Sequence, residues 1–304
     1  MLRTDLALEA KEMYHEKVGD TTEIEGVVAD SKEIDGVIVT HVEILNEKGS
    51  NNIGKPVGNY YTLEIPEFKE IGYAYYHLVS ELLSEYLKKI LPCMQGKTAL
   101  VVGLGNRHIT SDALGPFAVD KLIVTRHLFE LAPKSVGALG SLCAVSPGVL
   151  GGTGIETAEI IKGVCDKIKP DAVIVIDALA SRKTERVATT IQMSDTGINP
   201  GSGIGNHRKE ITKRYLGAPV VSIGVPMVVD SLTIAYDAID EIGMIEKTEI
   251  LNKIGKKKQD ENALFIVTPK DIDKLTTQMA NIISSAINIT LHNIKIEEID
   301  SYLG

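Results

Sequence analysis

The chain has 304 residues, of which 44% are hydrophobic and 24% are charged. This composition is typical of globular proteins and excludes a disordered or collagen-like chain. The sequence carries 41 Asp and Glu residues against 32 Lys and Arg residues, so its formal net charge is −9 at pH 7. Because a net negative charge repels phosphate backbones, general binding of nucleic acid is not expected. The length fits two domains or one large α/β domain.

Cysteine usage and the N-terminal residues indicate where the protein works. Cys93, Cys143 and Cys165 are widely spaced and form no CxxC pair, which predicts neither a disulfide framework nor a zinc site. The first residues, MLRTDLALEAKE, contain no apolar stretch of a signal peptide. Apolar runs such as residues 218–229 are shorter than the roughly 20 residues of a membrane-spanning helix. A soluble, cytoplasmic protein is therefore expected, with no membrane partner.

The N-terminal fifth of the chain has the pattern of β-hairpins. Residues 1–22 are polar and only weakly periodic. Residues 24–66 then group β-branched and aromatic residues between Asn- and Gly-rich breaks, which predicts an antiparallel hairpin region. Its strands are expected at residues 24–28, 36–45 and 58–65.

From residue 73 onward, helical patterns alternate with short apolar runs. Helical spacing of apolar residues predicts helices at 73–91, 114–129, 155–168 and 274–291. Continuous apolar runs predict buried strands at 98–103, 172–176, 219–224 and 264–267. The expected fold class is α/β, with a mixed, largely parallel sheet flanked by helices. We expect a single domain over residues 6–304, with the hairpin region at 24–66 and an αβ core at 73–292.

The loop after the first buried strand holds the first candidate site residue. Ligands of open α/β sheets bind beyond the carboxyl ends of the strands, and this strand ends in GLGNRHITSDALGP (residues 103–116). The loop is not a dinucleotide fingerprint, because His108 stands where the third glycine is needed and no ribose-binding acid follows a second strand. Asp112 lies just before a predicted helix, where it is either a helix-capping carboxylate or a functional one.

The second candidate is Asp177, which follows the apolar run of the next buried strand. An unpaired buried charge is costly, and Arg182 is one group that could neutralise it. If the two strands are neighbours, Asp112 and Asp177 project from the same edge of the sheet. Two close carboxylates share one proton, so that one takes a proton from water while the other polarises a peptide carbonyl. This pairing is a hypothesis, since the sequence gives positions and not distances.

Other motifs carry weaker signals. The triplet Asp195-Thr196-Gly197 matches the D-T-G of all-β aspartic proteases, but a single copy in an αβ context is more typical of a loop. The seven histidines show no HExxH spacing, and His108 near Asp112 is more typical of a hydrogen-bonded loop residue than of a metal ligand. The Gly-rich stretch at 146–157 either binds an anion or a peptide backbone or simply leads into a helix.

Several long segments resemble the spore germination protease family of endospore-forming bacteria. The resemblance runs from residue 3 to about residue 292, with the segments in the same order. They are RTDLALE (3–9), GLGNRHITSDALGP (103–116), SPGVLGGTGIETAEII (146–161), VIDALASR (175–182), SDTGINPGSGIGNHRKEI (194–211) and VTPKDID (267–273).

The resemblance implies an endopeptidase that initiates degradation of small acid-soluble spore proteins during germination. It implies an atypical aspartic peptidase without a cofactor, whose catalytic aspartates fall on Asp112 and Asp177. It also implies a homotetramer in the cytoplasm of the spore core, made as a zymogen that processes itself. The family is similar in fold to hydrogenase-maturation proteases, where corresponding acids meet a metal, so a metal-dependent hydrolase stays open as an alternative. A non-catalytic peptide- or nucleotide-binding protein is another, supported by the G-x-G turn.

The resemblance also points to a self-processing bond. Family substrates are cut after an acidic residue and before a hydrophobic one, followed by Ala, a variable residue and Glu. The stretch TDLALE (residues 4–9) fits this description, which implies processing between Asp5 and Leu6 and a short propeptide-like segment at residues 1–5. The family usually carries more residues before this bond. A second interpretation is that Asp5 caps a helix beginning at Leu6.

Overall fold

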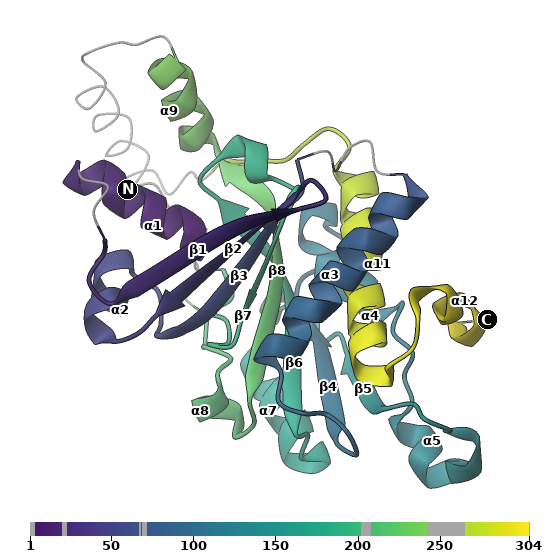
Figure 1. Ribbon diagram of the computed structural model, residues 1–304. Helices are drawn as coiled ribbons and strands as arrows, with labels where there is room; N and C mark the ends of the chain where they lie inside the picture. The colour runs from purple at the N-terminus through teal and green to yellow at the C-terminus, as the bar shows by residue number, and fades with distance from the viewer. Residues whose placement is uncertain are drawn as a thin grey trace.

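The computed structural model describes residues 4–19, 23–66, 68, 72–201, 208–241 and 265–303. Nine described strands form one mixed sheet, with the order β1-β2-β3-β7-β8-β6-β4-β5 and with β9 paired to β8 (Figure 1). Helices cover both faces of this sheet. The α/β fold class and the N-terminal antiparallel strands are therefore confirmed.

The sheet has an antiparallel half and a parallel half. The antiparallel strands are β1 (Val27–Ile34), β2 (Val37–Ile44), β3 (Gly58–Glu64), β7 (Thr190–Ser194) and the short β9 (Ile266–Val267). The parallel strands are β4 (Thr98–Gly103), β5 (Ser141–Val145), β6 (Ala172–Ser181) and β8 (Val220–Asp230). Strand β8 joins the halves, because it pairs parallel with β6 and antiparallel with β7. The hairpin region is thus an extension of the same sheet.

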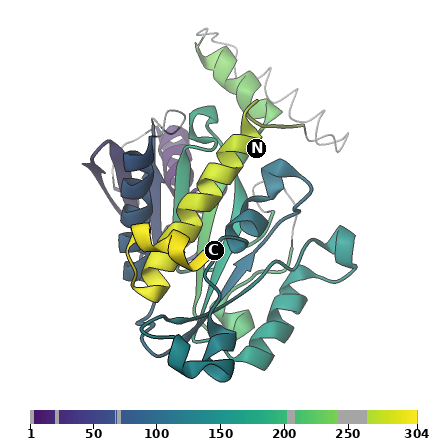
Figure 2. The same ribbon diagram turned by 90° about the vertical axis from the view of Figure 1, so that its right-hand side faces the viewer.

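The described helices divide between the two faces. On one face α3, α4 and the long α11 pack on one another and on the sheet (Figure 2). On the other face α7 and α8 pack on the parallel half, and α1 and α2 pack on the antiparallel half. The described helices are α1 (Ala7–Val18), α2 (Glu47–Ile53), α3 (Tyr73–Ile90), α4 (Leu114–Val119), α5 (Arg126–Leu131), α6 (Leu150–Thr153), α7 (Thr157–Ile168), α8 (Lys213–Leu216), α9 (Ser231–Glu241), α11 (Ile272–His292) and α12 (Ile299–Leu303).

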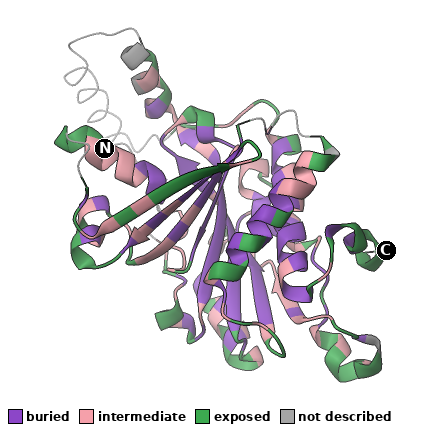
Figure 3. Ribbon diagram, in the orientation of Figure 1, coloured by how far each residue is buried: buried purple, intermediate pink, exposed green. Residues whose placement is uncertain are grey.

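The main core lies between the sheet and the face covered by α3 and α11. Helix α3 buries Val79, Leu83 and Leu87 at helical spacing, as its sequence pattern predicts. Strands β4 and β6 are buried along nearly their whole length, which explains why they show no alternation of polar and apolar residues (Figure 3). Among the helices that the structure describes, none combines the length and the apolar character needed to cross a membrane.

The expected continuous helix at 114–129 is wrong. The structure has two short helices there, with α4 ending at Val119 and α5 starting at Arg126. The break contains Ile123, Val124 and Thr125, which are β-branched and poor helix formers. In addition, the Thr125 hydroxyl donates to the Gly140 carbonyl and accepts from the Leu142 amide, so the chain is bound to β5 instead of continuing as a helix.

Strand β6 extends further than its apolar run predicts. It continues through Asp177 to Ser181, because its partner β8 is also longer than expected and pairs with it along this stretch. Asp177 therefore lies inside a strand and does not end it. Strand β4, however, ends at Gly103, which pairs with Ile176. Asp177 is the first residue of β6 beyond the end of its neighbour, so it still lies at the carboxyl edge of β4.

Candidate active site

Asp177 is a buried carboxylic acid, with 6% of its surface exposed. Its Oδ1 accepts a hydrogen bond of 3.0 Å from the Ala178 amide. Burial, followed by the negative charges of Asp112 and Asp5, raises the pKa of Asp177 well above its usual range. The Arg182 guanidinium, which the sequence offers as one group that could neutralise Asp177, is paired with Asp237 at 2.7 Å.

Asp112 ends the 3-10 turn Thr110–Asp112 in the loop after β4. Its Oδ2 accepts a hydrogen bond of 2.8 Å from the Asn106 amide, so the carboxylate faces back toward the loop. It does not cap α4, whose N-cap residue is Ala113 and has no side-chain cap bond. Burial raises the pKa of Asp112, and the bond from Asn106 opposes this effect.

The backbone brings the Asp112 loop to the strand that carries Asp177. Strands β4 and β6 are adjacent and parallel, and the Leu104 amide donates to the Ile176 carbonyl at 2.8 Å. Both acids therefore lie at the carboxyl edge of this strand pair. They are close enough for the charge of Asp112 to raise the pKa of Asp177.

The chain's own N-terminal segment lies against strand β6, which carries Asp177. Asp5 bonds twice to Ala180 of β6: its amide donates to the Ala180 carbonyl at 3.0 Å, and its Oδ2 accepts from the Ala180 amide at 2.9 Å. Ala180 is three residues beyond Asp177. Asp5 is not a helix cap, since α1 begins at Ala7 with Leu6 in the capping position and no side-chain cap bond.

The peptide unit that joins Asp5 to Leu6 is held by side chains from two other elements. The Asp5 carbonyl accepts from the Lys55 ammonium at 3.0 Å and from the Gln192 side-chain amide at 3.2 Å. The Gln192 Oε1 in turn accepts from the Ala7 amide at 2.6 Å. The Leu6 side chain is fully buried. Residues on both sides of this bond are thus fixed relative to the sheet.

Gln192 and Asp177 belong to one row across the sheet. Gly224 of β8 pairs with Asp177 on one side and with Gln192 of β7 on the other. Paired residues of neighbouring strands point to the same face, so both side chains face the side that carries α1 and α7, with only a glycine between them. At about 4.8 Å per strand, their Cα atoms are roughly 10 Å apart. The Asp5 main chain bridges this row, since its carbonyl bonds to Gln192 while its amide bonds to β6.

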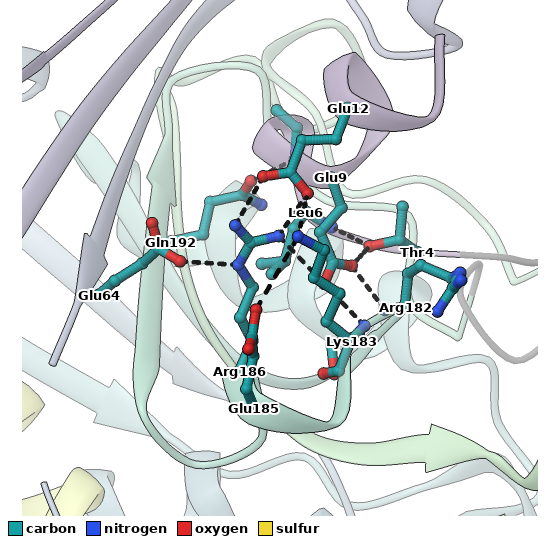
Figure 4. Close-up of polar contacts among 12 residues, drawn as sticks. Thr4, Leu6, Glu9, Glu12, Glu64, Arg182, Lys183, Glu185, Arg186 and Gln192 are labelled. Atoms are coloured by element: carbon teal, nitrogen blue, oxygen red, sulfur yellow. Dashed lines mark hydrogen bonds and ion pairs between the residues drawn. The ribbon is translucent and has the colours of Figure 1, made fainter. Parts of the chain in front are cut away.

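Four residues beyond Asp5, the Glu9 carboxylate is enclosed by a set of donors (Figure 4). It accepts from the amides of Arg182 and Lys183 at 2.5 and 2.9 Å and from the Arg186 guanidinium at 3.5 Å, and it also bonds to the Thr4 hydroxyl. We call Arg182, Lys183 and Arg186 the Glu9 receptor. Burial nevertheless raises the pKa of Glu9, against the effect of these bonds.

A cavity of about 1220 Å³ opens beside the N-terminal segment. The described residues that line it include Asp5, Lys55, Leu179, Gln192 and Gly224, whereas Asp112 and Asp177 do not line it. The cavity therefore borders Lys55, Gln192 and the Asp5 residue of the Asp5–Leu6 bond.

The weaker sequence motifs have structural roles in the described residues. Asp195 of the D-T-G triplet accepts from the backbone and side-chain amides of Asn59, both at 2.8 Å, and it lies in a loop after β7 as expected. The Gly-rich stretch contains the short helix α6, which ends at the left-handed Gly154 and leads into α7. Within the described ranges, no three His, Cys, Asp or Glu side chains gather in a way that could hold a metal ion.

Three residues of the site escape analysis of the sequence. Lys55 stands alone in a short loop, Gln192 lies between Ile191 and Met193 in a stretch that also holds Thr and Ser, and Arg186 lies in a turn rich in charge. None belongs to a motif with a known mechanism. The sequence TIQMS (190–194) mixes polar and apolar residues, so it does not single out Gln192.

Comparison with known proteins gives consistent matches along the chain. The sequence model described as germination protease matches residues 7–263. A protein named germination protease from Clostridium tetani is 46% identical, with 100% of this chain and 99% of the relative covered. Those from Caldanaerobacter subterraneus and from a Geobacillus species are 47% and 40% identical, covering 95% and 98% of this chain and 94% and 95% of the relatives. The chain therefore belongs to the germination protease family.

Proposed function

We propose that the chain is an endopeptidase of spore germination that cleaves small acid-soluble spore proteins and also cuts its own Asp5–Leu6 bond. The observation that carries the proposal is the position of that bond. The Asp5 backbone is bonded to Ala180, three residues from the buried acid Asp177, while Lys55 and Gln192 hold the Asp5 carbonyl. A peptide bond held against the strand that carries a buried acid of raised pKa supports acid–base hydrolysis at that bond.

In this proposal Asp112 acts as the general base and Asp177 acts as the general acid. The pKa of Asp177 is raised most strongly, so Asp177 keeps its proton, while the half-buried Asp112 ionises and acts as the general base. Asp112 takes a proton from a water molecule, whose oxygen bonds to the Asp5 carbonyl carbon. The carbon–nitrogen bond to Leu6 then breaks, and the Leu6 nitrogen takes up the proton that Asp177 donates. One water is consumed, and a carboxyl group and an amine are formed.

The contacts of residues 4–9 also support the proposed substrate class. A spore-protein segment with an acid, a hydrophobic residue, Ala, a variable residue and Glu would find the same partners. Its first acid would bond to Ala180, its main chain to Lys55 and Gln192, and its Glu to the Glu9 receptor. Because the chain's own Asp5 occupies the position of the substrate's first acid, the unprocessed protein would behave as a zymogen until residues 1–5 are released. A substrate Glu would reach the Glu9 receptor only after Glu9 itself has left it.

The test uses purified chain, a spore-protein substrate and mass spectrometry. Asp112→Asn and Asp177→Asn are expected to abolish both self-processing and substrate cleavage. Asp166→Asn, which removes an exposed acid of α7, is the matched control and should leave both rates unchanged. Full cleavage by either active-site variant would refute the proposed roles. Loss of cleavage with a chelator, restored by a divalent metal, would favour the metal-dependent alternative.

We further propose a homotetramer in the spore core. Sedimentation analysis of the purified chain should give a single species of four copies, and a monomer at micromolar concentration would contradict this part of the proposal alone.

A further inference from the structure

The Asp5 carbonyl is held by donors that the proposed acid–base mechanism does not use. Lys55 follows Gly54, the left-handed residue that ends α2, and its ammonium bonds to the carbonyls of both Thr4 and Asp5 at 3.0 Å. Gln192 reaches the Asp5 carbonyl from β7 at 3.2 Å. The two donors thus approach one carbonyl oxygen from different elements.

We propose that Lys55 and Gln192 form the oxyanion-binding pair for hydrolysis of the Asp5–Leu6 bond. The proposal rests on the proposed function, because it assigns these residues to the reaction that Asp112 and Asp177 perform.

The chemistry of the addition step explains the assignment. When the water oxygen bonds to the Asp5 carbonyl carbon, the carbonyl electron pair moves onto the oxygen and leaves it negatively charged. Donors within about 2.7–3.1 Å of that oxygen stabilise this charge more than they stabilise the neutral carbonyl. Lys55 and Gln192 lie at or near this distance before the reaction. Asp177 then has no need to donate to the oxygen, and its proton is available for the Leu6 nitrogen.

Both donors are fixed in advance of the reaction. Because the Gln192 Oε1 accepts from the Ala7 amide, its side-chain nitrogen is directed at the Asp5 carbonyl. The half-buried Lys55 faces the negative charges of Asp5 and Glu9, which oppose the lowering of its pKa by burial. Such preorganisation is what allows an oxyanion site to act without rearrangement.

The experiment measures single-turnover self-processing of the full chain by intact mass. Lys55→Met removes the ammonium and keeps most of the side-chain length. Gln192→Glu removes the amide donor and keeps the acceptor for Ala7. Each is expected to slow processing by about 100-fold, the usual effect of losing one oxyanion donor. Lys55→Arg, which keeps a cation, should slow processing clearly less than Lys55→Met does. Lys162→Met, at a partly buried position on α7, is the matched control and should process at the wild-type rate.

Hydrogen exchange at the Ala7 and Ala180 amides distinguishes an effect on catalysis from a displacement of residues 5–7. The Ala7 amide donates to the Gln192 side chain and the Ala180 amide donates to the Asp5 side chain, so both report on the position of residues 5–7. Unchanged protection together with a slower rate therefore supports the proposal. Processing at the wild-type rate in both Lys55→Met and Gln192→Glu overturns the proposal. A processing rate that falls only in proportion to the lost protection of these amides also overturns it. If Lys55→Met does not fold, the Gln192→Glu rate decides.

The proposed function fails separately from this inference. Processing by Asp112→Asn or Asp177→Asn would refute the acid–base roles themselves. Loss of processing in those variants, with full processing in Lys55→Met and Gln192→Glu, would refute only the oxyanion-binding pair.

Discussion

Glu9 and Arg186 form an ion pair in which the two side chains are only 1% and 7% exposed. Glu9 lies in the first turn of α1, and Arg186 lies in the 3-10 turn between β6 and β7. The pair therefore ties the N-terminal segment to the strands that carry Asp177 and Gln192. Arg186 also pairs with Glu12 and Glu64, each at 2.7 Å, so that one cation serves three carboxylates (Figure 4).

Replacing Arg186 by Leu is expected to destabilise the protein by about 3–5 kcal/mol, since it leaves Glu9 buried without its cation. Urea unfolding of unprocessed protein measures this change. Arg126→Leu is the matched control, because Arg126 is paired with Glu130 on the exposed surface of α5 and such a pair contributes less than about 1 kcal/mol. Equal stability losses in the two variants would show that the Glu9 receptor does not anchor the segment.

Asp177→Asn is expected to make the protein more stable at neutral pH. The folded state raises the pKa of Asp177, so it binds that proton more tightly than the unfolded chain does. The stability of the natural protein therefore falls as the pH rises from about 4 through the folded pKa, with a slope that approaches about 1.4 kcal/mol per pH unit inside this window. Asn does not titrate, and the advantage of the variant should grow across the same range.

Thermal unfolding at pH 4 and pH 7 checks this prediction. Asp166→Asn, on the exposed side of α7, should show no such pH-dependent gain. A destabilised Asp177→Asn at pH 7 would mean that the carboxylate has a stabilising partner in the folded protein. Gain of stability on removal of an active-site group is common, because such groups are placed for reaction and not for stability.

Asp5→Asn is expected to shift the pH profile of self-processing to lower pH. The charge of Asp5 contributes to the raised pKa of Asp177, so its removal lowers that pKa and Asp177 loses its proton earlier as the pH rises. The Asn side chain still offers an oxygen to the Ala180 amide. Rates of processing measured between pH 4 and 8 give the midpoint, which is the pH at which the rate has fallen to half its maximum. This midpoint does not depend on the maximal rate itself.

The control for this change is Glu16→Gln, which removes an equal charge from an exposed position on α1. Its midpoint should match that of the natural chain. A midpoint that stays fixed or rises in Asp5→Asn would show that the charge of Asp5 does not raise the pKa of Asp177.

Features with a local cause could be predicted from the sequence. Strands β4 and β6 are buried on both faces, so their continuous apolar runs identify them, and the acid that follows the run in β6 is Asp177. Strand β7 was not predicted, because TIQMS is short and Gln192 interrupts it. Its existence depends on pairing with β3 and β8, which are far away in the sequence.

The composition of the site depends even more on long-range contacts. Lys55 lies 50 residues from Asp5, and Gln192 lies 187 residues from it. No spacing rule connects such positions, since it is the sheet order that places β7 between β3 and β8. Of the two interpretations that the sequence left open for Asp112, the helix cap does not hold, because its carboxylate accepts from the Asn106 amide in the turn after β4.

Gly105→Ala is expected to damage both stability and self-processing. Gly105 has a φ of +108°, and a Cβ there would lie 1.9 Å from the Asp112 carbonyl oxygen and 3.0 Å from its Oδ1. The strained backbone alone costs about 1–3 kcal/mol, and relief of the clash must move the turn that holds Asp112.

Gly151→Ala is the matched control, because no heavy atom lies within 4 Å of a Cβ at that position in α6. The control should process normally and be about as stable as the natural chain. If Gly105→Ala folded with lower stability but processed at the full rate, the exact placement of Asp112 would not limit the reaction, and its assignment as the general base would have to be withdrawn.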